Sequence, residues 1–130
     1  MVNGLRAFVP ALLARGEPAH VLITASLAGL GVFPGGGAYG PSKHAVTAIA
    51  QQTALMLADT PVRVHMVCPS LVATGMSAEG VDPAWVAREA LQALDEDVFA
   101  VIPDEWKPAL VAQCDRIISG QWPIPPIPRG

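Results

Sequence analysis

The chain has 130 residues, of which 52% are hydrophobic and 15% are charged, and its formal net charge is -3. This length suits one domain with a hydrophobic core, and the composition is the opposite of that of a disordered chain. The acidic excess excludes a basic surface for nucleic acid, and the absence of a run of about 18 apolar residues excludes a membrane span. Cys68 and Cys114 match neither a disulfide framework nor a metal-binding spacing, which favours a reducing, cytoplasmic setting.

The first third of the chain predicts a helix, a strand and a long loop. Apolar residues recur at helical spacing over residues 2–15, and glycine and proline follow them. Residues 8–14 resemble the apolar core of a signal peptide, but only Arg6 precedes them and the helix explains their spacing better. Residues 20–25 form a short apolar run that is typical of a strand buried on both faces. The glycine-rich residues 26–40 then predict a loop.

The rest of the chain alternates helices with short apolar strands. Helical spacing returns over residues 39–58, with an apolar face made by Val46, Ile49, Ala50, Thr53, Ala54 and Leu57. Strands are expected at residues 62–68 and 98–102, and helices at residues 83–94 and 105–119. This order predicts a parallel α/β sheet over residues 1–120, followed by a proline-rich tail at residues 121–130. Ligands of such sheets bind at the carboxyl ends of the strands.

The chemistry of the chain centres on Tyr39, its only tyrosine, and on Lys43. Residues four apart on a helix share one face, so the ammonium of Lys43 is expected near the phenol of Tyr39. A nearby cation favours the phenolate and makes the tyrosine a candidate general acid and base. Ser26 follows the strand at residues 20–25, where its hydroxyl is placed to polarise a carbonyl or to bind an alcohol oxygen. Taken alone, a tyrosine and a lysine at this spacing are more often a solvated helix start.

With its surroundings, this constellation resembles the short-chain dehydrogenase/reductase family. The resemblance rests on Ser26 after an apolar strand, on Tyr39-Gly-Pro-Ser-Lys43, and on Pro69-Ser-Leu-Val-Ala-Thr74 after the next strand. It implies a Rossmann-like parallel sheet with flanking helices and an NAD(P)-dependent oxidoreductase that interconverts an alcohol and a carbonyl. Hydride would pass between the nicotinamide and a small-molecule alcohol or ketone.

The resemblance also implies a role for each matched residue. Tyr39 would exchange the proton with the substrate oxygen, and Ser26 would position that oxygen. Lys43 would hold the nicotinamide ribose beside Tyr39. The residues that would contact the nicotinamide carboxamide region are Pro69, Val72 and Thr74. No metal is implied, and the scattered histidines have no ligand spacing.

Two departures from the family pattern concern the cofactor. Ser70 stands where the family usually has glycine. The glycine-rich fingerprint that receives the pyrophosphate is absent, and Asn3 lies too close to Ser26 to be the family's asparagine. We therefore expect the catalytic, C-terminal half of a fold truncated on its N-terminal side, with weak cofactor binding and no way to choose between NAD and NADP. Residues 35–43 lack the lysine position of a phosphate loop.

A second hypothesis is non-enzymatic. The family pairs its subunits through the helices that correspond here to residues 2–15 and 39–58, so a homo-oligomer, or a truncated interaction and dimerisation module, is the alternative. The tail at residues 123–128 has the spacing of a polyproline recognition ligand, or folds back over its own or a neighbouring subunit's surface. The three tryptophans are more often packing residues than pocket residues: Trp85, Trp106 and Trp122.

Overall fold

A computed structural model describes residues 1–127 of the chain. The elements follow the predicted alternation of helices and strands, with two short 3-10 turns added. They are α1 (Val2–Arg15), β1 (Ala19–Thr24), η1 (Leu27–Gly29), α2 (Tyr39–Met56), β2 (Val62–Val67), α3 (Pro83–Asp95), β3 (Ala100–Val101), η2 (Asp104–Trp106) and α4 (Lys107–Ile118). The predicted α/β architecture is confirmed.

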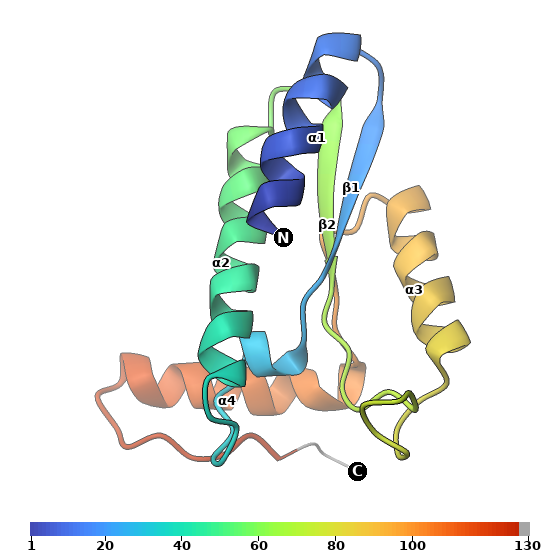
Figure 1. The fold of residues 1–130 in the computed structure, drawn as a ribbon. Helices are drawn as coiled ribbons and strands as arrows, with labels where there is room; N and C mark the ends of the chain where they lie inside the picture. Colours follow the sequence, from blue (N-terminus) through green and yellow to red (C-terminus); the bar gives the residue numbers. More distant parts are fainter. Residues whose placement is uncertain (128–130) are drawn as a thin grey trace.

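The three strands form one parallel sheet in the order β1-β2-β3. Helices α1 and α2 lie on one side of this sheet and α3 lies on the other, while α4 runs across the end at which the strands finish (Figure 1). The carboxyl ends of β1 and β2 lie next to each other because Thr24 pairs with Val67. The loops that leave these two ends are therefore neighbours in space although they are far apart in sequence.

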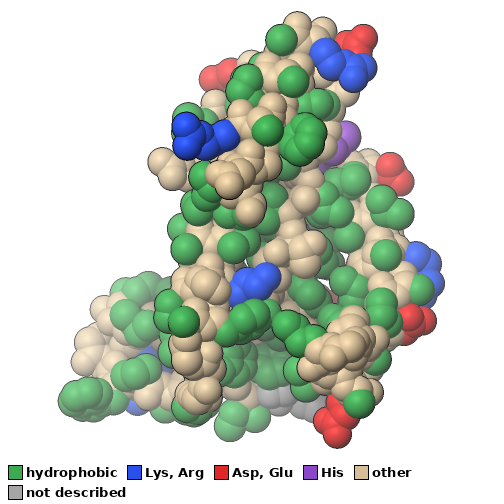
Figure 2. Space-filling view, viewed as in Figure 1, with side chains coloured by type: hydrophobic (Ala, Val, Ile, Leu, Met, Phe, Trp, Pro, Cys, Tyr) green, Lys and Arg blue, Asp and Glu red, His purple; other side chains and the backbone are tan. Residues whose placement is uncertain are grey.

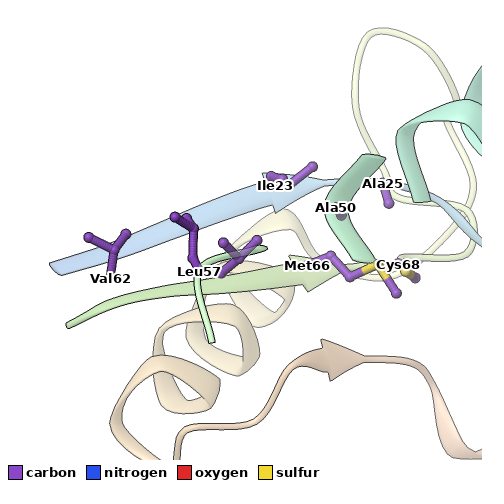
Figure 3. Packing of buried hydrophobic residues seen from close by; sticks show 8 residues of the cluster. Ile23, Ala25, Ala50, Leu57, Val62, Met66 and Cys68 are labelled. Atoms are coloured by element: carbon purple, nitrogen blue, oxygen red, sulfur yellow. The ribbon is translucent and has the colours of Figure 1, made fainter. Parts of the chain in front are cut away.

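The hydrophobic core lies between the sheet and the helices α1 and α2. Ile23 of β1 and Met66 of β2 meet Ala50 of α2 there, and Leu57 and Val62 extend the cluster away from Cys68 (Figure 3). The predicted apolar face of α2 is the face that packs on this core. Burial of these side chains is the main stabilising term of the fold.

Two strand predictions were wrong in detail. β1 is not buried on both faces, since exposed residues alternate along it with Ala19 and Val21, which are partly buried, and Ile23, which is buried. The reason is that β1 is an edge of the described sheet and that α3 packs on β2 and β3 instead. The strand expected at residues 98–102 is reduced to Ala100–Val101, which pairs with β2 alone.

The last predicted helix also begins later than expected. A 3-10 turn covers Asp104–Trp106, and α4 begins at Lys107. Pro108 stands in the first turn of α4, where its lack of a backbone N–H costs no helical hydrogen bond. Proline thus fixes where the helix can begin.

The segment after α4 folds back on the protein. The backbone carbonyl of Ile124 accepts a hydrogen bond from Gln113 Nε2 at 2.8 Å, and that of Trp122 accepts one from Arg116 Nε at 2.7 Å. Of the two alternatives for the tail, these contacts of residues 121–127 favour the segment that covers its own surface. Its last residues, 128–130, lie outside the described residues. Within the described part of the chain, no helix has the length and apolar character of a membrane span.

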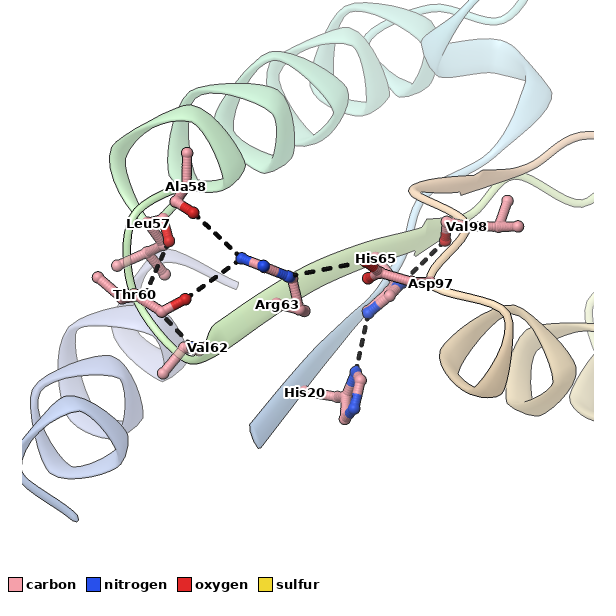
Figure 4. Close-up of polar contacts among 9 residues, drawn as sticks. All are labelled: His20, Leu57, Ala58, Thr60, Val62, Arg63, His65, Asp97 and Val98. Atoms are coloured by element: carbon pink, nitrogen blue, oxygen red, sulfur yellow. Dashed lines mark hydrogen bonds and ion pairs between the residues drawn. The ribbon is translucent and has the colours of Figure 1, made fainter. Parts of the chain in front are cut away.

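A pair of histidines on β1 and β2 forms a hydrogen-bonded link to the segment before β3, away from the carboxyl ends of the strands. His65 is 1% exposed, and its Nδ1 lies 2.8 Å from the carbonyl oxygen of Val98, to which it must donate (Figure 4). In the neutral ring Nε2 is then an acceptor, and it receives the hydrogen bond of His20 Nδ1 at 2.9 Å. His65 is thereby a buried polar link between β1 and the chain that leads into β3.

Replacing His65 by leucine is expected to lower the free energy of unfolding by about 1–2 kcal/mol, because both hydrogen bonds are lost while the volume is largely kept. Chemical denaturation measures this difference. Arg63→Ala on the same strand is the control, since the contacts of Arg63 are all exposed: an ion pair of 3.7 Å with Asp97 and hydrogen bonds of 3.2 Å to the carbonyls of Ala58 and Thr60 (Figure 4). The control should cost less than about 1 kcal/mol. Equal costs for the two variants would contradict a special role for the histidine pair.

Candidate active site

The three residues predicted to carry the chemistry come together at the carboxyl end of β1. Ser26 follows β1 and caps η1, its Oγ accepting a hydrogen bond from the backbone N–H of Ala28 at 3.2 Å. Tyr39 is the first residue of α2 and Lys43 lies one turn further on. All three line one cleft of about 740 Å³.

The conformation of the glycine-rich loop positions Tyr39 in this cleft. Gly35 and Gly37 have φ values of +85° and +52°, in the left-handed region that glycine adopts without steric cost. The backbone N–H of Tyr39 then donates to the carbonyl of Gly36 at 3.1 Å, and α2 begins. The side chain of Tyr39 is 45% exposed, so its phenol is accessible from the cleft.

The ammonium of Lys43 lies between the end of β1 and the ring of Tyr39. Its Nζ donates to the carbonyl oxygens of Ala25 at 3.2 Å and Thr24 at 3.4 Å, and it lies 5.7 Å from the centre of the Tyr39 ring. An ammonium has three donors, so one remains for a ligand. The arrangement places a fixed positive charge beside an accessible phenol.

The loop after β2 lines the same cleft. Pro69, Val72 and Thr74 all line it, as the sequence predicts. The loop is joined to η1 by a hydrogen bond from the backbone N–H of Leu27 to the carbonyl of Pro69 at 3.1 Å. Thr74 Oγ1 accepts from the backbone N–H of Met76 at 3.2 Å. The structure thus brings all six predicted residues to one place, while the role of each stays a prediction.

The apolar lining of the cleft includes Trp106, which the sequence favoured as a packing residue. Phe33 and Trp106 contact each other edge to face, with ring centres 5.7 Å apart, and both line it. No sequence pattern links these two residues, because their contact depends on how α4 crosses the sheet. Trp85 and Trp122 do not line this cleft.

Charge is nearly absent from the cleft. Lys43 is the only charged residue among those that line it. Hydrophobic side chains gather over the loops at this end of the molecule, and acidic side chains lie towards its margins (Figure 2). Within residues 1–127, no group of three or more histidine, cysteine or acidic side chains is arranged to hold a metal ion.

Cys68 lies buried below the cleft. Burial raises the pKa of its thiol from 9.0 to about 11, against the opposing effects of a backbone hydrogen bond from Ser26 and the charge of Lys43. A thiol kept protonated in this way is a poor nucleophile. It is a packing residue here, as its position between a strand and a proline suggests.

Near neutral pH, a thiol reagent is expected to modify the exposed Cys114 and to spare Cys68 until the chain unfolds. Mass spectrometry of the labelled chain measures this, and a Cys114→Ala variant should stay unlabelled while folded. Rapid labelling of Cys68 in the folded Cys114→Ala variant would contradict its burial.

The raised pKa of Cys68 also makes the free energy of unfolding depend on pH. Because the thiol of the unfolded chain ionises first, the contribution of Cys68 to this free energy is complete below pH 9.0 and falls as the pH rises towards 11.

Comparison with known proteins identifies relatives of this site. Residues 1–84 match the family model described as short chain dehydrogenase. The chain is 40% identical over 100 residues to 1-deoxy-11-beta-hydroxypentalenate dehydrogenase of Streptomyces avermitilis, covering 77% of this chain and 37% of that protein. The enzyme of the same name from Streptomyces exfoliatus is 49% identical over 71 residues, or 55% of this chain and 26% of that protein.

Solved structures share the fold over almost the whole chain. LigO from Sphingobium superposes with a TM-score of 0.80 at 27% identity, over 92% of this chain and 46% of LigO. A short chain dehydrogenase/reductase from Burkholderia phymatum, solved in complex with NAD, gives a TM-score of 0.79 at 23% identity, over 98% of this chain and 58% of that one. The chain therefore spans about half the length of these solved structures.

Proposed function

Because the chain belongs to the short chain dehydrogenase family, we propose that it carries the catalytic half of an NAD(P)-dependent oxidoreductase that interconverts an alcohol and a carbonyl. One observation carries this proposal. Ser26, Tyr39 and Lys43 lie in one cleft at the carboxyl ends of parallel strands, where α/β proteins bind their ligands. Residues from two separate loops meet there with the chemistry that a proton transfer to a carbonyl oxygen requires.

In the proposed mechanism, the substrate oxygen lies between Ser26 and Tyr39. The Ser26 hydroxyl, held at the start of η1 by its cap, donates a hydrogen bond that positions this oxygen. Tyr39 gives its phenolic proton to the oxygen in carbonyl reduction and takes it back in alcohol oxidation. The ammonium of Lys43 stabilises the phenolate that forms.

The residues present fit the nicotinamide end of a dinucleotide. Lys43 keeps one donor free for a ribose hydroxyl, and Pro69, Val72 and Thr74, which line the same cleft, would contact the carboxamide. When bound, the nicotinamide supplies or accepts the hydride. Residues that contact the 2′ position of the ribose determine whether such a protein binds NAD or NADP, and the proposal includes both cofactors.

A chimera tests the proposed function. This chain replaces the matching residues of the Streptomyces avermitilis relative, whose remaining length supplies the rest of the fold. With NADH or NADPH and a panel of ketones, we expect hydride transfer, measured as loss of the absorbance of the reduced nicotinamide. A folded chimera, verified by circular dichroism, that reduces none of these ketones would overturn the proposal.

We also propose that copies of the chain pair through α1 and α2. Three apolar side chains on these helices are largely exposed: Phe8 at 68%, Leu55 at 79% and Met56 at 76%. Burying such surface in a partner is favourable. Sedimentation should give twice the chain mass of 13.5 kDa, and a Phe8→Lys/Leu55→Lys variant should be monomeric. Val111→Lys on α4 is the control, and a monomeric parent chain would contradict the pairing.

The same experiments separate the catalytic proposal from the non-enzymatic one. A chain that dimerises, while its folded chimera transfers no hydride, would favour the interaction module.

A further inference from the structure

The aromatic pair in the cleft is a feature that the proposed mechanism does not use. Phe33 comes from the glycine-rich loop, whereas Trp106 ends η2 and begins α4. The two rings meet edge to face at 5.7 Å, which is a favourable geometry for aromatic side chains. Together they form one wall of the cleft that holds Ser26, Tyr39 and Lys43.

The surfaces near this wall are apolar as well. Leu27, Leu71 and Met76 line the same cleft, and Leu71 and Met76 are 61% and 80% exposed. The one charged residue of the cleft, Lys43, already donates to two backbone carbonyls. Phe33 and Trp106 themselves carry no charge with which to compensate an ionic group held against them.

Gln113 fixes the position of the pair. It is 4% exposed, and its side chain forms hydrogen bonds with both the N–H and the carbonyl of Val32, the neighbour of Phe33. Oε1 accepts from the N–H of Val32 at 2.7 Å, and Nε2 donates to its carbonyl at 3.0 Å and to the carbonyl of Ile124 at 2.8 Å. Gln113 belongs to α4, and Trp106 is the N-cap residue of the same helix. The hydrogen bonds of Gln113 to Val32 therefore fix the position of Phe33 relative to Trp106.

Close packing around Gly31 also holds the loop that carries Phe33 against α4 and the tail. A Cβ on Gly31 would lie 2.7 Å from Leu110 Cδ2 and 3.2 Å from Pro126 Cγ, so the loop, α4 and the tail leave no room for a side chain there. The loop that carries Phe33 is thus bound on one side by α4 and on the other by the tail. These contacts hold the wall in place without a ligand, which lowers the cost of ordering it on binding.

We propose that Phe33 and Trp106 bind an uncharged, ring-bearing apolar group of the substrate, and that Gln113 is the positioning residue that holds this wall. The inference rests on the proposed function only in treating the bound molecule as a substrate. Aromatic side chains favour edge-to-face and offset contacts with another ring, whereas a charged group held against Phe33 and Trp106 would lose hydration that these two side chains do not replace.

Binding to the full chain tests the wall without relying on catalysis. The probes are β-tetralone, an uncharged bicyclic ketone, and a carboxylated β-tetralone of the same shape, each titrated by calorimetry. We expect the uncharged probe to bind at least ~10-fold more tightly. Trp106→Ala should weaken its binding by about 10-fold, and Trp106→Phe should restore most of it. Trp122→Ala, at a residue that is 86% exposed and outside the cleft, is the matched control.

The role of Gln113 has its own readout. Gln113→Leu should raise amide hydrogen exchange at Val32 by at least ~10-fold and reduce the preference for the uncharged probe. Gln92→Leu, on the exposed face of α3, should change neither. A purely structural role would lower the melting temperature of Gln113→Leu and leave the ratio of the two affinities unchanged.

Equal binding of the two probes, no binding of β-tetralone, or a folded Trp106→Ala variant with undiminished affinity would overturn the inference. Failure of the proposed function has a different signature, since β-tetralone would still bind while the chimera transfers no hydride. The two outcomes are therefore distinguishable.

Discussion

Replacing Tyr39 by phenylalanine is expected to lower the rate of hydride transfer in the chimera by about 10²–10⁴-fold, the contribution of a positioned general acid or base. The substitution removes one oxygen from a side chain that is 45% exposed, so the packing of α2 should be unchanged. The loss should fall on kcat rather than KM, because the missing proton transfer matters in the transition state. Rates measured by nicotinamide absorbance, with and without the substitution, decide the matter.

Ser42→Ala provides the control for this prediction. Ser42 lies on the same turn of α2, but its hydroxyl donates to the backbone carbonyl of Tyr39 at 2.7 Å rather than forming part of the cleft. We expect this variant to keep most of the activity. Full activity of Tyr39→Phe would remove the tyrosine from the mechanism.

Local patterns in the sequence predicted the order of the α-helices and strands and singled out Ser26, Tyr39 and Lys43, whereas Pro69, Val72 and Thr74 came from the family resemblance. The spacing of Tyr39 and Lys43 depends only on helical geometry. Ser26 and Pro69 follow apolar strands, whose carboxyl ends lie at the same edge of a parallel sheet. Local periodicity and strand order are properties that a single sequence carries.

Contacts between distant segments could not be predicted in this way. Gln113 binds Val32 across 81 positions, and a buried glutamine on a helix looks in sequence like any exposed one. The partial exposure of β1 has the same origin, since its apolar residues do not reveal which helices cover them. Both depend on how the helices pack, which the helical period alone does not specify.

The close approach of η1 to α2 is a third such contact, and it makes Gly29 sensitive to substitution. A Cβ at this position would lie 2.5 Å from the carbonyl oxygen of Lys43 and 2.6 Å from Thr47 Oγ1. The first is backbone, and Thr47 is only 4% exposed, so neither atom can move aside freely. Gly29→Ala should therefore lower the free energy of unfolding by about 3 kcal/mol, at the upper end of overpacking costs.

Gly29→Ala should lower the activity of the site as well as the stability of the fold. Ser26 caps η1 and Lys43 belongs to α2, so separating the two elements moves the serine away from the lysine and its neighbour Tyr39. Denaturation curves and kcat of the chimera should fall together for Gly29→Ala. Gly36→Ala is the matched control in the same loop, because a Cβ there would meet only the Phe33 carbonyl oxygen at 3.9 Å. A stable and active Gly29→Ala variant would mean that η1 can leave α2 without disturbing the site, and the cleft would then be less rigidly built than its contacts imply.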